Sequence, residues 1–410
     1  MTLFGILWLA IILWDFIKKP IANTVFLTIL FMTFQSTNVL YVNGTGVGPG
    51  VLASIVLIIK ILFKQNFKIR KIKQSPSVFI TVFLLLFSVF LSLTLNGVLG
   101  VNLMLFMQIS VYVLCFVAIQ FIKKDISEEF TYQIIRKIII FHVIFGIIQF
   151  LTSTNILPFR GILDALFYND PSTDVVFHRA FYPRVMSTFM EPSYAAGFFV
   201  GSFYFLALYK QRIKQNKWLL LIIFVEILLT QSSTAYGAFI VVGLILVIFS
   251  DQFTLKQKLI ICGGSIIGLT ILYFGFYSLL DAVIFSKSLT GSYRTRERFN
   301  NVAIKAFLGS PIFGVGYKNC RGSSIIYSLL GQMGIIGIAV YFGFNSFICF
   351  SKNKMQKHSG ILLKASKAGV ISALACQIIA CPDLDLCTYW IWLYIFSVSL
   401  HDARKNIRNI

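Results

Sequence analysis

The strongest constraint in this sequence is a repeated pattern, in which runs of about 15 to 25 mostly apolar residues alternate with short polar connections. About 20 apolar residues give an α-helix the length that it needs to cross the hydrocarbon core of a bilayer. Charged residues form only 12% of the chain, about half the fraction usual in soluble proteins. The pattern therefore excludes a soluble enzyme, a secreted disulfide scaffold and a disordered chain.

The apolar runs predict an all-α polytopic integral membrane protein with about 13 transmembrane helices, in a range of about 11 to 14. We expect residues 1–410 to form a single membrane domain. The first run has no preceding basic residue and no small-residue cleavage site, so we interpret it as a retained span. The expected helices lie near residues 2–17, 21–38, 49–63, 77–95, 99–122, 133–152, 192–209, 218–232, 235–250, 259–280, 323–350, 366–381 and 388–400.

Basic residues are concentrated in alternate connections of this predicted bundle. One set, which includes the connections at 64–73, 210–217 and 352–367, holds about 25 of the 36 Lys and Arg residues. Because the positive-inside rule assigns such loops to the cytoplasm, the N-terminus is expected outside and the C-terminus in the cytoplasm. Most of the net charge of +21 then reflects topology, and nucleic acid is not expected as a partner.

Two connections on the other, outer face are long, at 153–191 and 281–322. Neighbouring membrane helices need only a few connecting residues, so two loops of about 40 residues are expected to carry function. No metal or cofactor is expected, because the spacing of Cys381 and Cys387 fits no common zinc pattern and no phosphate-binding Gly-rich loop occurs. A disulfide between these two cysteines is left open. We therefore expect the chemistry on the outer face.

The first outer loop ends with Arg184 and with Glu191-Pro192 at the start of the next apolar run. Pro192 suits the first turn of a helix, and an acidic side chain beside a helix N-terminus is favoured by the helix dipole. Glu191 is therefore either a capping acid accompanied by an interfacial arginine, or a group that handles a proton while Arg184 binds an anion. Both interpretations stay open from this segment alone.

The second outer loop is expected to contain a helix at 292–308, ended by a Gly-Ser-Pro sequence. At about 100° per residue, Arg294, Arg298 and Lys305 fall within a sector of about 40°. Arg296 points the other way. The helix is expected to lie in the membrane interface. Its cations either attract lipid headgroups or bind a phosphate or pyrophosphate, which the planar guanidinium of arginine favours.

Acidic residues elsewhere supply weaker candidates. Glu226 lies within an apolar run, where an ionisable residue is a functional candidate by default, although the sequence offers it no partner. Asp15 is expected at the cytoplasmic boundary, close to Lys18. Asp383 and Asp385 fall in the last outer connection, from which they could face the same outer cavity as the long loops.

The order of several short motifs resembles the O-antigen polymerase and ligase superfamily. The first outer loop ends in a segment that is similar to the family's R-x-x-G-x-F-x-E/N-P-x entry to a span, with Ser187 where many members have Gly. Arg298 and Gly309 have the Arg-x10-Gly spacing of the second large loop. The matches follow the family order over about residues 180–345, and the N-terminal half matches only in hydropathy. The matching segments are RVMSTFMEPS at 184–193, LLTQSSTAYG at 228–237, SPIFGVG at 310–316 and LLGQMGIIG at 329–337.

The resemblance implies a metal-independent, membrane-embedded glycosyltransferase of the GT-C type in the bacterial cytoplasmic (inner) membrane. Such polymerases transfer a growing glycan from undecaprenyl pyrophosphate to an incoming lipid-linked repeat unit on the outer face, which makes O-antigen, capsule or exopolysaccharide. The implied partners are the undecaprenyl-pyrophosphate-linked oligosaccharide, membrane lipids, and a chain-length regulator and a flippase of the same pathway.

The resemblance also implies roles for the outer-loop residues. Arg298 and Arg184 are expected to stabilise the charge of the departing pyrophosphate, with Glu191 as the proton acceptor. The residues expected to support pyrophosphate binding are Arg294, Lys305 and Arg321.

Two alternatives stay open. O-antigen ligases follow a similar pattern but carry a histidine before the GIIG-like element, and counting back from Gly334 places Ser323 at that position here. This departure favours the polymerase over the ligase. A lipid-linked oligosaccharide flippase, the second alternative, should show two related halves and a charged central path. No internal repeat is visible in the sequence, so the polymerase is the preferred prediction.

Overall fold

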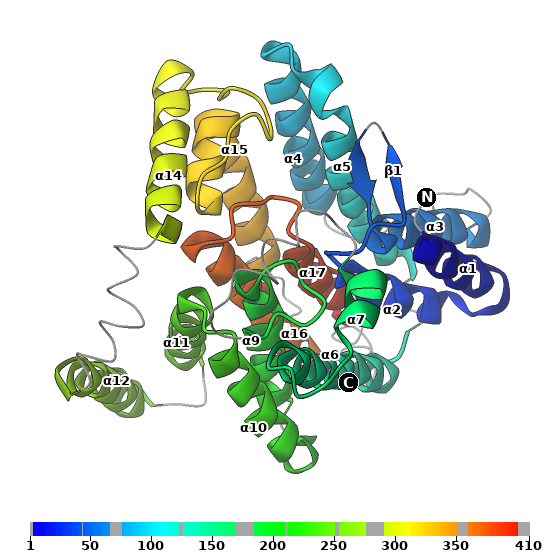
Figure 1. The fold of residues 1–410 in the computed structure, drawn as a ribbon. Helices are drawn as coiled ribbons and strands as arrows, with labels where there is room; N and C mark the ends of the chain where they lie inside the picture. Colours follow the sequence, from blue (N-terminus) through cyan, green and yellow to red (C-terminus); the bar gives the residue numbers. More distant parts are fainter. Residues whose placement is uncertain are drawn as a thin grey trace.

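The computed structural model describes residues 3–42, 44–65, 76–122, 126–168, 184–209, 212–250, 254–275, 291–350 and 360–400. This part of the chain is almost entirely helical (Figure 1). A helix occupies each of the thirteen segments predicted to be apolar helices. These helices are α1 (Leu3–Lys18), α2 (Ile21–Met32), α3 (Pro49–Lys64), α4 (Pro76–Leu95), α5 (Leu99–Ile122), α6 (Glu128–Ser153), α9 (Pro192–Leu208), α10 (Ile213–Leu229), α11 (Ser233–Ile248), α12 (Leu255–Gly275), α15 (Ile325–Phe350), α16 (Ile361–Ile379) and α17 (Cys387–Ser399).

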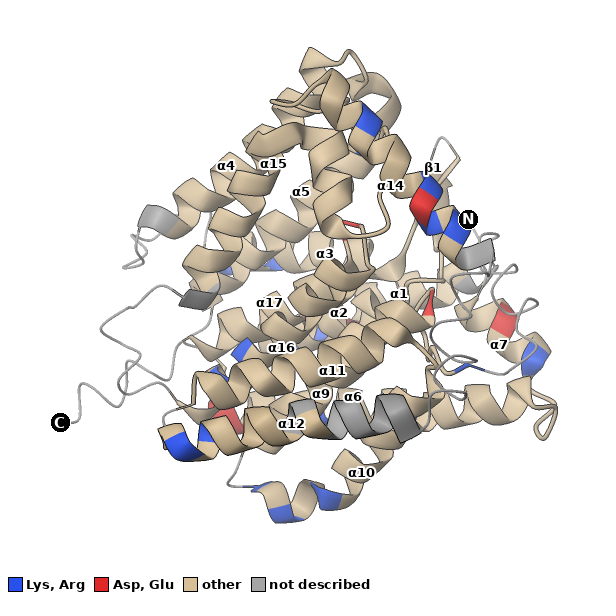
Figure 2. Ribbon diagram, turned by 90° about the vertical axis from the view of Figure 1, so that its left-hand side faces the viewer, with Lys and Arg blue, Asp and Glu red and all other residues tan. Residues whose placement is uncertain are grey.

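Five helices of the described part, α4, α5, α6, α15 and α16, are long and apolar enough to cross a membrane. Three of them, α4, α5 and α15, contain no Lys, Arg, Asp or Glu. Figure 2 shows blue and red residues mainly at the ends of helices and on α14 (Gly291–Gly309). The chain is therefore an all-α protein with helices suited to a membrane. About half of the basic residues used to predict its orientation lie outside the described residues.

Helices α9, α16 and α17 form the centre of the bundle (Figure 1). Every residue of α17 from Thr388 to Ser399 is buried. The ring of Trp392 fits between two glycines of the neighbouring helices, because a Cβ on Gly201 or Gly369 would meet its atoms at 2.5 and 2.1 Å. Small residues thus allow α9 and α16 to pack closely on either side of the indole.

The segment after α2 differs from the prediction. The expected span at 21–38 ends at Met32, and the expected loop at 39–48 contains a hairpin of β1 (Leu40–Val42) and β2 (Thr45–Val47). The physical reason is that β-branched and aromatic residues flank an Asn-Gly sequence, and this sequence pattern favours a hairpin. Hydropathy alone does not report this local preference.

The predicted outer loops are described in part. The first, 153–191, contains α7 (Arg160–Phe167), and its residues 169–183 lie outside the described residues. In the second, 281–322, the description begins at residue 291, and a helix is present where 292–308 was predicted, as α14.

The connections assigned to the outer face contact one another. The Nδ2 of Asn96, between α4 and α5, donates to the Gly314 carbonyl at 3.1 Å. The Gln35 amide, after α2, donates to the Thr188 carbonyl at 3.2 Å. We call this end of the molecule the site end, formed by residues 33–39, 96–98, 184–191, 230–233, 310–324 and 380–386.

Connections of the other set also meet. The ammonium of Lys60 in α3 donates to the carbonyls of Asp15 and Lys19 and to the Thr24 hydroxyl, each at 2.8 Å. These bonds use all three donors of a lysine that lies in an apolar run. Near the start of α16, the Leu362 amide donates to Glu128 Oε1 at 3.1 Å. In the described part of the chain, these contacts lie within one set of connections and the helix ends beside it.

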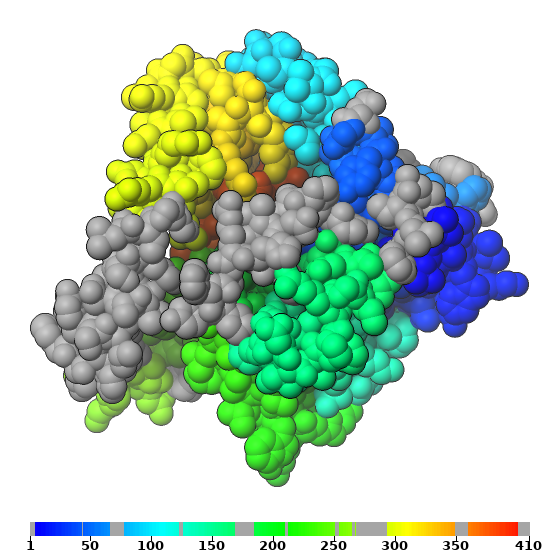
Figure 3. All heavy atoms as spheres, viewed as in Figure 1, coloured from blue at the N-terminus to red at the C-terminus, as the bar shows by residue number. Residues whose placement is uncertain are grey.

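The two C-terminal motif segments are joined by backbone hydrogen bonds. The amides of Val315 and Ile335 donate to the carbonyls of Gly331 and Pro311, both at 2.9 Å. Helix α15 is kinked at Gly334, where φ is +64°, and a Cβ there would meet the Ile312 backbone at 2.4 Å. In Figure 3 the yellow α14–α15 pair forms one continuous surface with the cyan α4.

We predict that Gly334→Ala lowers the free energy of unfolding by about 2 kcal/mol or more, since alanine resists this φ value and its methyl group would overlap the backbone at residue 312. Thermal unfolding of the detergent-solubilised protein measures the effect. The control is Gly343→Ala in the same helix, where a Cβ meets no atom within 4 Å. Equal unfolding midpoints for the two variants would contradict the prediction.

Candidate functional site

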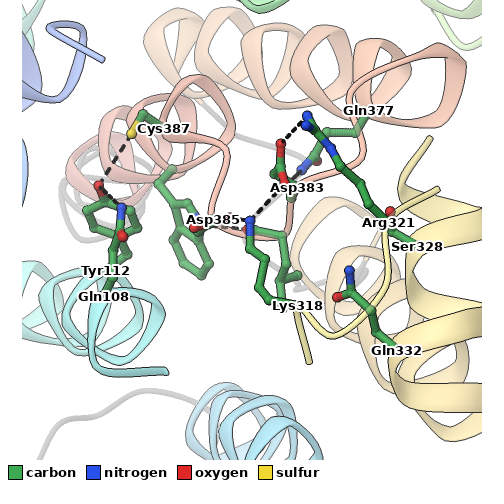
Figure 4. Close-up of polar contacts among 12 residues, drawn as sticks. Gln108, Tyr112, Lys318, Arg321, Ser328, Gln332, Gln377, Asp383, Asp385 and Cys387 are labelled. Carbon is green, nitrogen blue, oxygen red and sulfur yellow. Dashed lines mark hydrogen bonds and ion pairs between the residues drawn. The ribbon is translucent and has the colours of Figure 1, made fainter. Parts of the chain in front are cut away.

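Charged and hydroxyl side chains gather at the site end from three connections far apart in the chain, and Figure 4 shows the contacts between the second and the third. The first leads into α9, the second joins α14 to α15, and the third joins α16 to α17. We call the group the polar cluster. It consists of Arg184, Glu191, Tyr194, Lys318, Arg321, Asp383 and Asp385.

Ion pairs join the second and third connections. The Nζ of Lys318 lies 2.7 Å from Asp383 Oδ1 and 2.7 Å from Asp385 Oδ1. The other oxygen of Asp383 accepts from the Tyr194 hydroxyl at 2.5 Å and lies 3.3 Å from Arg321 Nη2. Arg321 also donates to the Tyr194 hydroxyl at 3.0 Å. Asp383 is therefore the common partner of one residue from α9 and two from the second connection.

These contacts fix the charge state of Asp383 and Lys318. Burial alone would raise the pKa of the Asp383 carboxyl, but Lys318 and Arg321 hold it well below its usual range. Burial alone would lower the pKa of the Lys318 ammonium, but Asp383 and Asp385 raise it well above its usual range. Both groups stay charged near neutral pH, so Asp383 is a fixed anion and a poor general base.

Helices α14 and α15 hold the second connection in place. The Nε2 of Gln332 donates to the Cys320 carbonyl at 2.6 Å, and the Gly322 amide donates to Ser328 Oγ at 2.9 Å. The Ser323 amide donates to Asn300 Oδ1 of α14 at 2.9 Å. Arg321 therefore projects from a backbone that two helices hold at several points, although its own side chain is 47% exposed.

Helix α6 holds the first connection. The side-chain oxygen of Gln149 accepts from the amides of Met186 and Ser187, at 2.9 and 3.2 Å. Ser187 has φ +51°, a left-handed conformation that favours glycine. The Ser187 hydroxyl also lies 3.0 Å from Nδ1 of the buried His142, which gives that histidine a structural role.

Arg184 has a structural role beside its predicted one. Its Nε and Nη2 donate to the carbonyls of Thr230 and Gln231, at 2.9 and 3.1 Å. A cation is favoured at this C-terminal end of α10. The pKa of Arg184 is lowered by burial, and the negative charge of Glu191 opposes that shift. Two of the five N–H donors of the guanidinium are used in this way, so the others can bind a ligand.

Glu191 precedes α9 at its N-cap position, and its side chain does not cap the helix. Its Oε2 accepts a hydrogen bond from the Ser193 hydroxyl at 3.0 Å. Its negative charge acts on both Arg184 and Arg321. Glu191 thus belongs to the polar cluster. The alternative role as a helix-capping acid is not supported, because the Glu191 side chain accepts no hydrogen bond from the backbone amides at the start of α9.

The predicted residues of α14 lie elsewhere. Arg294, Arg298 and Lys305 line a shallow depression whose lining residues all come from α14 itself. It is therefore an exposed helix face rather than an enclosed cavity. The structure brings Arg184, Glu191 and Arg321 into one cluster and places the other three predicted residues on this face.

Sequence reasoning missed Lys318 and Tyr194. A usable signal was present, because Asp383 and Asp385 lie in an otherwise apolar region and such carboxylates need nearby cations. Both carboxylates lie in the polar cluster, where they form ion pairs with Lys318. Cys381 and Cys387 are free thiols.

Glu226, the other acidic candidate, is buried in α10. Its side chain fits against Gly146 of α6, where a Cβ would meet Glu226 Oε2 at 2.4 Å. Neither carboxyl oxygen has a hydrogen-bond partner within the described ranges. Glu226 therefore has no described contact with the residues of the polar cluster.

Models of known protein families give no match to this chain, and a search of curated proteins gives no significant relative. Functional inference therefore depends on the chain's own motifs and geometry.

We predict that Lys318→Met lowers the free energy of unfolding by about 3 kcal/mol, because it leaves two largely buried carboxylates without their shared cation. Denaturant or thermal unfolding at neutral pH measures the loss. Lys305→Met, on the exposed face of α14, is the matched control and should change stability by less than about 0.5 kcal/mol. Equal losses in the two variants would contradict the assigned role of Lys318.

The pH dependence of wild-type stability follows from the two pKa shifts. The contribution of Asp383 is fully present above its unfolded pKa of about 3.9 and is lost as pH falls through its lower folded pKa. The contribution of Lys318 is fully present below its unfolded pKa of about 10.4 and is lost as pH rises through its higher folded pKa. The stability difference between wild type and Lys318→Met should therefore be largest near neutral pH. It should shrink in acid as the Asp383 carboxyl of the variant, which has lost Lys318, takes up a proton, and a pH-independent difference would contradict this account.

Proposed function

We propose that this protein is a polysaccharide polymerase that resembles the O-antigen polymerases. It transfers a growing glycan from undecaprenyl pyrophosphate to an incoming lipid-linked repeat unit on the outer face of the bacterial cytoplasmic membrane. The observation that carries the proposal is the convergence of the resembling segments. RVMSTFMEPS supplies Arg184 and Glu191 to the polar cluster, and SPIFGVG leads directly into the connection that supplies Lys318 and Arg321.

The proposal includes the GT-C-like architecture of about 13 spans with the N-terminus outside. Two observations support it. A helix occurs in each predicted apolar segment, and the connections of each alternate set contact members of their own set. The site end then faces outward, where a lipid-linked oligosaccharide is presented.

The proposed reaction is a single displacement at the anomeric carbon of the donor glycan. The acceptor hydroxyl oxygen forms the new glycosidic bond while the bond from that carbon to the pyrophosphate oxygen breaks. The pyrophosphate leaves on undecaprenol with the bonding electrons, and the acceptor proton passes to a base. Fixed cations stabilise the charge that develops on the leaving oxygen, because they need no reorganisation during the step.

Glu191 is the carboxylate of the cluster best suited to take the proton. Asp383 and Asp385 both form ion pairs with Lys318 at 2.7 Å, so both are already engaged with a cation. Glu191 accepts one hydrogen bond, from the Ser193 hydroxyl. It also interacts electrostatically with Arg184 and Arg321. A proton acceptor beside two guanidinium groups places the attacking hydroxyl close to the departing pyrophosphate.

Elongation by the purified protein is the test of this function. The full-length chain is reconstituted in vesicles whose outer leaflet carries undecaprenyl-pyrophosphate-linked repeat units. We expect products longer than one repeat unit and release of undecaprenyl pyrophosphate, both without added metal or nucleotide. Faster movement of the repeat units between leaflets with no elongation would instead identify a flippase. Transfer to a lipid A-type acceptor without repeat-to-repeat linkage would identify a ligase.

We predict that Glu191→Gln lowers the rate of elongation by about 100-fold or more, because the amide cannot accept the proton. Binding of the lipid-linked unit and the unfolding midpoint should change little. Glu297→Gln, on the exposed face of α14, is the matched control and should keep the wild-type rate. If Glu191→Gln elongates at the wild-type rate, Glu191 is not the proton acceptor, and another base accepts the proton in the proposed reaction.

A further inference from the structure

One face of α14 is turned toward the connection that carries Arg321. Asn300 of α14 accepts a hydrogen bond from the Ser323 amide at 2.9 Å. Ala303 is completely buried against α15, where a Cβ on Gly331 would meet the Ala303 carbonyl at 3.0 Å. Residues 296, 300 and 303 are spaced i, i+4 and i+7, so they share this face. Arg296 therefore lies one turn before Asn300 on the side of α14 that packs against the second connection.

The electrostatics of the polar cluster include Arg296. Its charge acts on Arg184, whose pKa is lowered first by burial and further by this second guanidinium. It also acts on Cys381, two residues before Asp383, and there it opposes the rise in the thiol pKa that burial causes. The positive charge of Arg296 thus acts on residues of the first and third connections.

Arg296 supplies a positive charge that the rest of the cluster lacks. Three cations, Arg184, Lys318 and Arg321, face three carboxylates, Glu191, Asp383 and Asp385, so their formal charges sum to zero. No carboxylate in the described part of the chain forms an ion pair with Arg296, and its side chain is exposed. A multiply charged anion needs surplus positive charge in its site, and Arg296 is the residue positioned to provide it.

We propose that Arg296, rather than Arg298, is the residue of α14 that binds the pyrophosphate of the lipid-linked substrate. Arg298 lies in the depression on the exposed face of the helix, about 200° around the axis from Arg296. The inference rests on the proposed function for the identity of the substrate. Its geometric part, an anion site between α14 and the polar cluster, is measured separately with inorganic pyrophosphate.

The test compares Arg296→Gln and Arg298→Gln in the full-length protein. Two quantities are measured, the affinity for inorganic pyrophosphate in detergent and the KM for the lipid-linked donor during elongation. Arg296→Gln should weaken pyrophosphate affinity and raise KM by about 10- to 100-fold, the effect of one charge-assisted hydrogen bond. Arg296→Lys should recover part of the loss, because it restores the charge without the planar fork.

Arg298→Gln should have a much smaller effect on both quantities. Arg160→Gln, on the exposed surface of α7, controls for the loss of any surface arginine and should match wild type. Equal unfolding midpoints for the variants show that each is folded.

The possible outcomes separate the two proposals. If wild type elongates and Arg296→Gln matches it in both measurements, the inference is wrong and the polymerase function stands. If Arg298→Gln shows the larger loss, the exposed face of α14 is the anion site and the inference is wrong. If the wild-type protein does not elongate the glycan, but Arg296→Gln binds pyrophosphate more weakly than wild type and Arg298→Gln does not, the anion site stands and the polymerase function fails.

Discussion

The paired interaction of Lys318 with Asp383 and Asp385 is the constraint on which the site end depends. It joins two connections that lie 65 positions apart in the sequence, counted from Lys318 to Asp383. Asp383 extends the interaction to Tyr194 at the start of α9 and to Arg321. Because breaking a buried ion pair leaves an uncompensated charge, this network stabilises one arrangement of three helices. It also positions Arg321, whose side chain is 47% exposed and available to a ligand.

Helix positions could be predicted from this sequence, because hydropathy reports burial in a membrane or a core directly. The helix α14 could be predicted as well, from its start and stop residues. The end of α2, the β1–β2 hairpin and the kink at Gly334 could not. They depend on turn chemistry and on the contact of residues 310–316 with residues 329–337, which periodicity does not record.

Only part of the candidate site could be predicted, again because tertiary contacts are not visible in the sequence. The motif at 184–193 led to Arg184 and Glu191, and the resemblance implied Arg321 as a supporting residue; all three share the cluster. The choice among the arginines of α14 relied on their clustering in one sector and on the Arg-x10-Gly spacing of Arg298, and neither feature reveals which side of a helix is packed. The packed side is set by Asn300 and Ala303, so Arg296 faces the connection and Arg298 faces outward. Lys318 was missed because its partners lie at the far end of the chain.

A structure determined with bound undecaprenyl pyrophosphate is the most direct test of the central claim that the polar cluster is the substrate site. The account predicts density for the pyrophosphate at the site end, in contact with Arg321 and Arg296 and close to Glu191. Density on the outward face of α14 beside Arg298, or at the connections around Lys60, would contradict it.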